Sequence, residues 1–139
     1  MGFREDLRFG NYYEKKYEPM LNEKFGKTTK SAPNRVFKDF DFEFEKGCVE
    51  VKADRMVERT GNFYIEFECN GRSSGISATK SSHYLLINAS KENEYYLVDT
   101  HTLISIANEE NCRVVCGGDG GRTKGFLVTK DLLNRFKNI

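Results

Sequence analysis

The sequence contains no tryptophan, and its 139 residues include only two prolines and four cysteines. So few prolines exclude an extended proline-rich linker. No apolar run approaches the roughly 20 residues that a transmembrane helix needs, and the first residues lack the apolar stretch of a signal peptide. These absences predict a protein that has no membrane partner and resides in the cytoplasm.

The four cysteines are too few and too scattered for the disulfide framework of a small secreted protein. Cys112 and Cys116 have the spacing of half a zinc site, but the other half is missing. The two histidines, His83 and His101, do not stand at ligand spacing. We therefore interpret the cysteines as reduced thiols.

Charged residues make up 31% of the chain and hydrophobic residues 38%, which is typical of a globular protein. The net charge of +1 conceals three blocks: +5 over residues 15–38, −5 over 39–68 and +4 over 113–139. Clustered carboxylates repel one another unless a cation or a basic neighbour relieves them, and basic flanks suit a polyanion such as nucleic acid. An ordinary mixed surface is the alternative interpretation.

The chain length and the pattern of apolar residues predict one α/β domain over residues 1–139, with a mixed β-sheet and flanking helices. Apolar residues near helical spacing predict a helix from residue 5 to about residue 25, and the turn-forming stretch 26–34 is expected to be a loop. Further along, the pattern predicts a short helix at 77–82, strands at 84–88 and 94–99, a helix at 101–109, a strand at 113–116, a glycine-rich loop at 117–121, a strand at 126–128 and a helix at 130–137.

Between these regions, three segments alternate apolar and polar residues with the period of two that marks a half-buried strand. Phe40, Phe42 and Phe44 alternate with acidic residues. The alternation continues beyond a predicted turn at Lys46-Gly47, and residues 62–69 repeat it. The prediction is a three-stranded meander with one apolar face and one charged face, preceded by a helix and followed by a helix and a strand.

With that turn, the charged face of the hairpin carries three cross-strand pairs: Glu45 with Cys48, Glu43 with Glu50, and Asp41 with Lys52. Two glutamates that face each other destabilise a hairpin. A bound divalent cation would reverse this effect, since Mg²⁺ is held by one or two carboxylates together with water and substrate phosphate. A lysine beside the metal can assist an attacking water or neutralise charge on a phosphate in the transition state.

Asp41 and the element Glu50-Val51-Lys52 across a hairpin, after a helix that contains Glu14, resemble the PD-(D/E)XK nuclease superfamily. This superfamily is also called restriction-endonuclease-like and includes Holliday-junction resolvases, repair nucleases and many phage nucleases. Its core runs helix, three-stranded meander, helix, strand, which is similar to the order predicted for residues 5–90.

The resemblance implies a metal-dependent DNA endonuclease that hydrolyses phosphodiester bonds with metal-activated water, with branched or phage-replication DNA as the substrate class. It implies that Asp41 and Glu50 hold Mg²⁺, for which Mn²⁺ can substitute, and that Lys52 is the catalytic lysine. Glu14 matches an acidic residue that many members place on the first helix, and so becomes a further metal-ligand candidate. The glycine-rich stretch 117–121 also resembles small phage-encoded members, for which the location would be the cytoplasm of a bacterial host.

The chain departs from the family pattern just before Asp41. Phe40 stands where the family name has a proline, and Asp39 competes for the role of the aspartate because it lies on the same strand face. Asp39 is therefore an accessory candidate. Glu66 in the third predicted strand is another, as an accessory ligand or water-orienting group, with a solvated strand face as the alternative.

Three basic residues are candidates for contacting a DNA backbone: Lys80, Arg122 and Lys124. The stretch 117–125 fails the Walker pattern because Lys124 is followed by glycine, and no helix is expected to begin there. A loop that carries Arg122 and Lys124 to phosphates is the functional interpretation, and a plain connection between strands is the alternative.

A non-catalytic nucleic-acid-binding protein that keeps the nuclease fold is the alternative function, and a small scaffold protein is a third. The presence of Asp41, Glu50 and Lys52 together favours the enzyme, because a degenerate copy is expected to lose one of them. Cutting both strands of a duplex needs two sites related by a twofold axis, so we expect a homodimer. The aromatic residues, 13% of the chain, supply apolar surface for such an interface.

Overall fold

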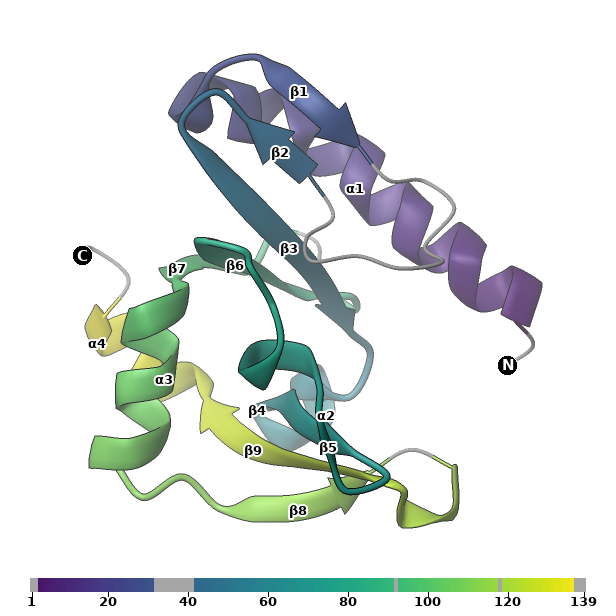
Figure 1. Ribbon diagram of the computed structural model, residues 1–139, viewed down its shortest axis with the longest axis vertical. Helices are drawn as coiled ribbons and strands as arrows, with labels where there is room; N and C mark the ends of the chain where they lie inside the picture. The colour runs from purple at the N-terminus through teal and green to yellow at the C-terminus, as the bar shows by residue number, and fades with distance from the viewer. Residues whose placement is uncertain (1–2, 32–41, 92, 118, 137–139) are drawn as a thin grey trace.

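The computed structural model describes residues 3–31, 42–91, 93–117 and 119–136 of the chain (Figure 1). Its elements follow in the order α1 (Phe3–Phe25), β1 (Thr28–Ser31), β2 (Phe42–Phe44), β3 (Gly47–Asp54), α2 (Val57–Thr60), β4 (Asn62–Cys69), β5 (Arg72–Ser73), the 3₁₀ helix η1 (Gly75–Ser77), β6 (His83–Asn88), β7 (Tyr95–Asp99), α3 (Thr100–Glu109), β8 (Val114–Gly117), the 3₁₀ helix η2 (Asp119–Gly121), β9 (Thr123–Thr129) and α4 (Lys130–Phe136). No helix among the described residues is both long enough and apolar enough to cross a membrane.

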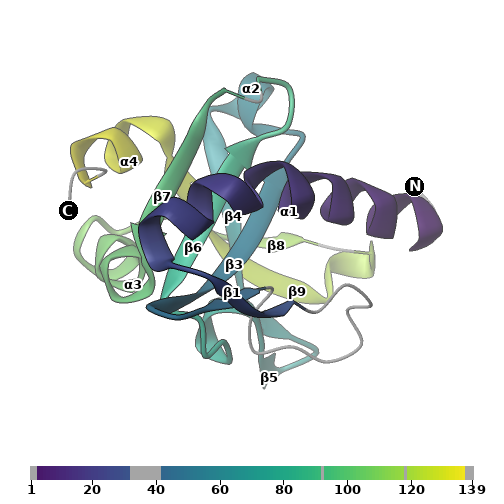
Figure 2. The ribbon, with the colours of Figure 1, turned by 90° about the horizontal axis from the view of Figure 1, so that it is seen from above.

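The strands form two sheets. The first sheet has the order β1-β2-β3-β6-β7, in which β3 and β6 run parallel and the other neighbours antiparallel. The second sheet is antiparallel, with the order β5-β4-β9-β8. Helix α1 lies across one face of the first sheet (Figure 2), and the second sheet lies on its other side (Figure 1). The predicted class, an α/β domain with a mixed sheet and flanking helices, is confirmed.

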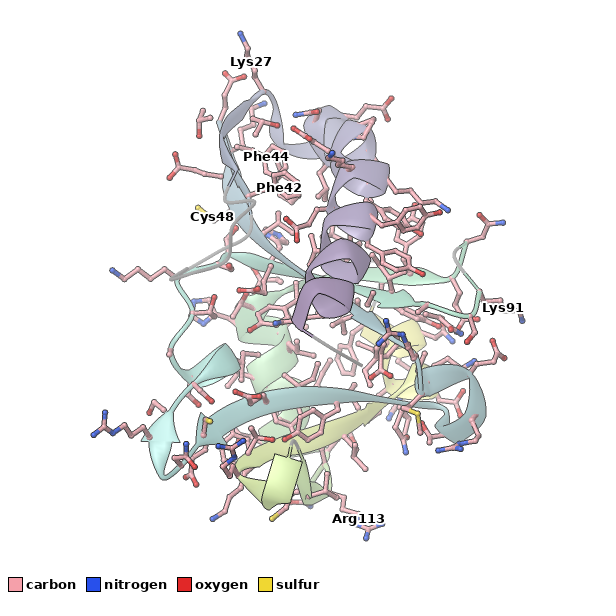
Figure 3. All side chains as sticks on the ribbon, turned by 90° about the vertical axis from the view of Figure 1, so that its right-hand side faces the viewer. Lys27, Phe42, Phe44, Cys48, Lys91 and Arg113 are labelled. Atoms are coloured by element: carbon pink, nitrogen blue, oxygen red, sulfur yellow. The ribbon has the colours of Figure 1, made fainter. Side chains whose placement is uncertain are left out.

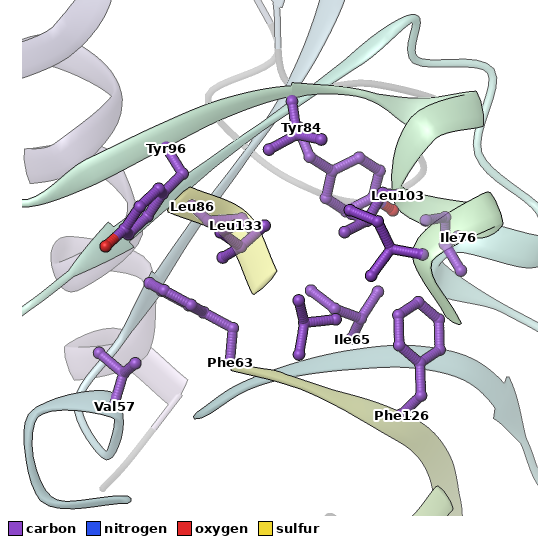
Figure 4. Close-up of a cluster of buried hydrophobic side chains, with 13 residues drawn as sticks. Val57, Phe63, Ile65, Ile76, Tyr84, Leu86, Tyr96, Leu103, Phe126 and Leu133 are labelled. Atoms are coloured by element: carbon purple, nitrogen blue, oxygen red, sulfur yellow. The ribbon is translucent and has the colours of Figure 1, made fainter. Parts of the chain in front are cut away.

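Strand β6 is buried on both faces. Its uninterrupted apolar run Tyr84-Leu85-Leu86-Ile87 is typical of such a strand. Leu85 and Ile87 belong to the core beneath α1, whereas Tyr84 and Leu86 belong to the core between the two sheets. Both sheets and the helices α3 and α4 contribute to the second of these cores (Figure 4). Its buried members include Val57, Phe63, Ile65, Ile76, Tyr84, Leu86, Tyr96, Leu103, Phe126 and Leu133.

Helix α1 buries one stripe of side chains spaced four residues apart: Tyr13, Tyr17, Leu21 and Phe25. Phe42 and Phe44 of β2 point toward this helix, while Cys48 on β3 points away from it (Figure 3). The helix ends where Gly26 adopts a φ of +88°, and the N–H of Gly26 donates to the carbonyl of Asn22. The apolar face of the predicted hairpin is therefore its helix-facing side.

The predicted meander is wrong in one strand. The structure forms its three-stranded antiparallel meander from β1, β2 and β3, so part of the expected loop 26–34 is a strand. Residues 62–69 do form a strand, but β4 pairs with β9 in the second sheet. The alternation of β4 was real, because Phe63 and Ile65 are buried. A period of two says which face is buried but not which strand is the neighbour.

The predicted turn is also displaced. Phe44 pairs with Gly47, so Glu45 and Lys46 form the two-residue turn instead of Lys46 and Gly47. Glu43 consequently faces Cys48 and not Glu50. The end of α1 holds this register, because the N–H of Lys46 donates to the carbonyl of Phe25 at 2.8 Å.

The remaining elements are close to prediction. Helix α1 begins two residues earlier than expected and continues through Pro19. The predicted helix at 77–82 is replaced by the 3₁₀ turn η1 at Gly75–Ser77. The strands and helices expected beyond residue 84 are present with boundaries that shift by one to three residues.

Candidate active site

A cleft of about 370 Å³ opens where β3 of the first sheet meets β4 of the second. It is lined by Glu50, Lys52, Tyr64, Ile65, Glu66, Gly75, Ala78, Thr79 and Tyr84. Three residues that the sequence singled out, Glu50, Lys52 and Glu66, therefore share one cavity although they come from two different sheets. Tyr64 and Thr79 were not predicted, since an isolated tyrosine or threonine in a strand or loop carries no sequence signal.

Glu50 and Lys52 reach this cleft because side chains alternate along β3. Val49 and Val51 face the core beneath α1, which turns Glu50 and Lys52 toward the second sheet. Only 13% of the Glu50 side chain is exposed, against 54% for Lys52, and Lys52 Nζ lies 3.7 Å from Glu50 Oε2. The pair thus combines a nearly buried carboxylate with a half-exposed ammonium group beside it.

Glu66 is held from the other side of the cleft. The Ser74 hydroxyl donates to Glu66 Oε2 at 2.8 Å, and the Ser74 N–H donates to the carbonyl of Phe67. Gly75 then passes so close to β4 that a Cβ there would lie 2.1 Å from the Glu66 carbonyl oxygen, and its φ is +50°. Only glycine fits at this position, so η1 can pack directly against β4. This packing keeps Ser74, which precedes η1, within hydrogen-bond distance of the Glu66 carboxylate.

Asp54, the last residue of β3, connects the two walls of the cleft. Its Oδ1 accepts from the N–H of Met56 at 2.7 Å and its Oδ2 from the N–H of Tyr64 at 3.4 Å. Its carbonyl accepts from the N–H of Ala89 at 2.9 Å. The Asp54 carboxylate therefore stabilises the turn by which the chain leaves the first sheet. It also accepts from a backbone N–H on the side of β4 that faces away from β9.

The other predicted acidic residues are placed differently. Asp39 and Asp41 lie outside the described residues. Glu14 is buried, at 5% exposure, on α1, which packs on the face of the first sheet opposite to the cleft. Glu43 does not line the cleft, and its carboxylate accepts from the Thr29 hydroxyl at 2.7 Å. The predicted Glu43–Glu50 repulsion is thus not present as a directly opposed pair.

The three predicted DNA-contacting residues are exposed, and each neighbours the cleft in sequence or through one contact. Lys80 directly follows Thr79, which lines the cleft. Arg122 and Lys124 flank Thr123, whose hydroxyl lies 2.7 Å from the hydroxyl of the cleft residue Tyr64. Lys124 also forms a 3.6 Å ion pair with Glu68 at the surface, an interaction that solvent weakens.

A second polar cluster joins β3 to β6 at the start of both strands. The Ser82 hydroxyl donates to the Cys48 carbonyl and accepts from the Cys48 N–H, each at 3.0 Å, and lies 2.9 Å from His83 Nδ1. Burial lowers the pKa of His83, and the nearby Asp99 carboxylate opposes this shift. Burial raises the pKa of the Cys48 thiol, as does Glu43. Because the Ser82 hydroxyl bonds to both backbone groups of Cys48 and so joins the two strands, we interpret this cluster as structural.

The metal expected from the sequence can be tested against the cleft. Among the described residues, no three histidine, cysteine or acidic side chains form a group that could hold a metal ion. Two carboxylates, Glu50 and Glu66, line the cleft. This number matches Mg²⁺, which proteins usually hold through one or two carboxylates while water and substrate phosphates complete the shell. The donor chemistry of the cleft therefore fits Mg²⁺.

Comparison of the chain with protein-family models, with curated proteins and with solved structures finds no match.

Proposed function

We propose that the protein is a Mg²⁺-dependent DNA endonuclease that hydrolyses phosphodiester bonds in the cleft between β3 and β4. The observation that carries the proposal is the meeting of Glu50, Lys52 and Glu66 in one cavity. The first two come from the element on which the resemblance to PD-(D/E)XK nucleases rests, and Glu66 was expected as an accessory to the same site, although from a strand of the same sheet. A chance arrangement of surface charges gives no reason for two carboxylates and a lysine to line the same cleft.

In this proposal Glu50 and Glu66 hold the metal ion together with an aspartate, Asp41 or Asp39, from the segment before β2. Glu14, which the resemblance offers as a further ligand, is left out of this set because it is buried on α1, which packs on the opposite face of the first sheet. When bound, Mg²⁺ would supply Lewis-acid polarisation of the phosphate and a water of lowered pKa, and Mn²⁺ could replace it.

Lys52 places a positive charge beside the nearly buried carboxylate of Glu50. In a partly closed cleft such a charge interacts more strongly than in bulk water. The ammonium group can therefore stabilise negative charge that develops on the phosphate during the reaction. Ser74 acts through Glu66, because its hydroxyl fixes the orientation of that carboxylate.

The order of the elements also supports the proposal. The chain runs through α1, the meander β1-β2-β3 and a crossover to β6, which lies parallel to β3. This is the order that the resemblance implies, except that α2, β4, β5 and η1 occupy the crossover where one helix was expected.

The test is cleavage of supercoiled plasmid, linear duplex and four-way-junction DNA with Mg²⁺, with Mn²⁺ and with EDTA. We expect cleavage with either metal and none with EDTA. Glu50→Gln and Glu66→Gln should lower the rate about 100-fold or more, because a metal ion contributes several kcal/mol to the transition state. Glu68→Gln is the matched control: it lies on the same strand as Glu66 but outside the cleft, and its rate should be unchanged.

Metal-independent DNA binding without cleavage would favour the alternative, a nucleic-acid-binding protein that keeps the fold. Equal rates for Glu50→Gln and Glu68→Gln would show that the cleft is not the active site.

A further inference from the structure

Strand β8 leaves one edge of the second sheet open. It pairs with β9 on one side, and no strand among the described residues pairs with its other side. Its sequence Val-Val-Cys-Gly holds neither a charge nor a proline, and its pairing with β9 has no register shift. Natural edge strands are usually protected by such a device or by being very short, and β8 is short, at four residues, but has none of the others. Val114 at the start of β8 is 56% exposed.

The hydrogen bonds show which backbone groups this edge presents. The N–H of Leu127 donates to the carbonyl of Arg113 at 2.9 Å, so Arg113 points its backbone groups toward β9. Because these directions alternate along an antiparallel strand, Val115 also bonds to β9. The N–H and C=O groups of Val114 and Cys116 therefore point away from the sheet, toward the open side.

Apolar side chains accompany this edge. A groove of about 290 Å³ lies beside Val114 and is lined largely by apolar residues of β4, η1, α3 and β9, among them Ile104 and Phe126. Ile104 is 36% exposed. A partner strand that added to β8 would therefore gain hydrogen bonds along its length and apolar contact at Val114.

We propose that a second copy of this chain occupies the edge, with the two β8 strands antiparallel about a twofold axis. Val115 then faces Val115 of the second copy, and Val114 faces Cys116. This register uses every outward-pointing group of β8 and gives four hydrogen bonds between the copies. A twofold register in which Val114 faces Val114, or Cys116 faces Cys116, would leave half of those groups unpaired.

The charges around β8 are compatible with this twofold arrangement. Glu109 and Glu110 end α3 on one side of the strand, and Lys124 pairs with Cys116 at its other end. An antiparallel copy brings Glu109 and Glu110 of one chain toward Lys124 of the other, in addition to the pairs of Glu110 with Arg135 and of Lys124 with Glu68 within each chain. Arg113 faces Gly117 of the second copy, so no like charge opposes it. Twofold dimers are the commonest closed oligomers, and the free groups of β8 can all pair in one, so a second copy is the occupant proposed here. The inference does not depend on the nuclease activity.

Disulfide formation tests the register. In a Cys116→Ser background, Val115→Cys should form a cross-linked dimer under mild oxidation, because Val115 would occupy a non-hydrogen-bonded pair in which side chains approach closely. Arg113→Cys is the matched control, since four residues of strand, about 13 Å, would separate its two copies. Equal cross-linking of the two variants, or none with Val115→Cys, would overturn the proposed pairing.

The oligomeric state tests the edge itself. Sedimentation at tens of micromolar should show a dimer for the parent chain and for Val114→Thr, which keeps an uncharged β-branched side chain. Val114→Lys should be a monomer, because an edge lysine blocks strand addition, and its melting profile should match that of the parent at dilutions where both are monomers. A monomeric parent chain, or a Val114→Lys variant that dimerises as tightly as the parent, would refute the proposal.

Discussion

At the scale of single residues, Lys52 is the position at which the proposed activity can be tested separately from DNA binding. Because its ammonium group lies beside Glu50 in the cleft, Lys52→Ala should lower the single-turnover cleavage rate about 100-fold or more while leaving DNA affinity within a few-fold. Lys124→Ala, outside the cleft and at similar exposure, should show the opposite pattern, weaker binding with an unchanged rate at saturation. Filter binding and single-turnover kinetics on the same preparations measure both. A Lys52→Ala variant that needs more DNA but turns over normally would make Lys52 only a binding residue.

His83 provides a prediction about pH. Burial lowers its pKa in the folded protein, so the unfolded chain takes up a proton at a higher pH than the folded chain does. The stability contributed by neutral His83 is therefore fully present above the unfolded value of about 6.5 and is lost as the pH falls below it. We expect the free energy of unfolding to fall between about pH 7.5 and 5, and to fall less in His83→Gln.

His101→Gln is the control for this titration, since that histidine is exposed on α3. Urea denaturation at each pH gives the measurement. If His83→Gln loses as much stability on acidification as the parent, the histidine does not contribute to the pH dependence.

At the scale of elements, the position of η1 against β4 depends on one glycine. Gly75→Ala would place a Cβ 2.1 Å from the Glu66 carbonyl oxygen, whereas Gly71→Ala meets nothing within 4 Å although its φ is also positive. We expect Gly71→Ala to cost about 1 kcal/mol of backbone strain. Gly75→Ala should cost clearly more and should also lower cleavage, because the Ser74 that holds Glu66 moves with η1. Equal losses of stability and activity in the two variants would contradict this account of the cleft.

The sequence predicted the faces of the strands better than their neighbours. Moving the turn from Lys46-Gly47 to Glu45-Lys46 keeps Phe42 and Phe44 on the side of α1, so the apolar pattern fits both registers equally. The hydrogen bond from Lys46 to Phe25 is made in the observed register. Local sequence patterns do not predict it, because they do not show where α1 packs relative to the hairpin. Pairing of β4 with β9 likewise joins segments about sixty residues apart, and no short motif encodes it.

The residues that line the cleft include three that the sequence named, but only the placement of Glu50 and Lys52 follows from the sequence, whereas Glu66 was expected from a strand of the same sheet. Glu50 and Lys52 follow from the period of two in β3. That Glu66 lies in the same cleft depends on Asp54, which turns the chain out of the first sheet and bonds to β4. Neither residue spacing nor composition reveals that turn.

At the scale of the whole molecule, the basic residues near the cleft should determine how the protein binds a DNA backbone. Lys80, Arg122 and Lys124 are exposed and adjoin Thr79 or Thr123 at the rim of the cleft. If each neutralises one phosphate, replacing all three by alanine should weaken duplex binding and lower the slope of log K against log salt by about 2.7, at about 0.9 per contact. Binding should weaken equally for different sequences, because phosphate contacts carry no base information.

A second triple variant, with Lys27, Lys91 and Arg135 replaced by alanine, is the matched control for this measurement. It removes the same number of lysines and arginines, all exposed, and Lys27 and Lys91 lie in widely separated parts of the molecule (Figure 3). Since the net charge falls by the same amount in both variants, a general effect of charge would change both salt slopes alike. If the DNA backbone binds beside the cleft, the salt slope falls in the first variant and stays at the parent value in the second. Fluorescence anisotropy with a labelled duplex over a series of salt concentrations distinguishes the two, and identical slopes would remove these three residues from the DNA-binding surface.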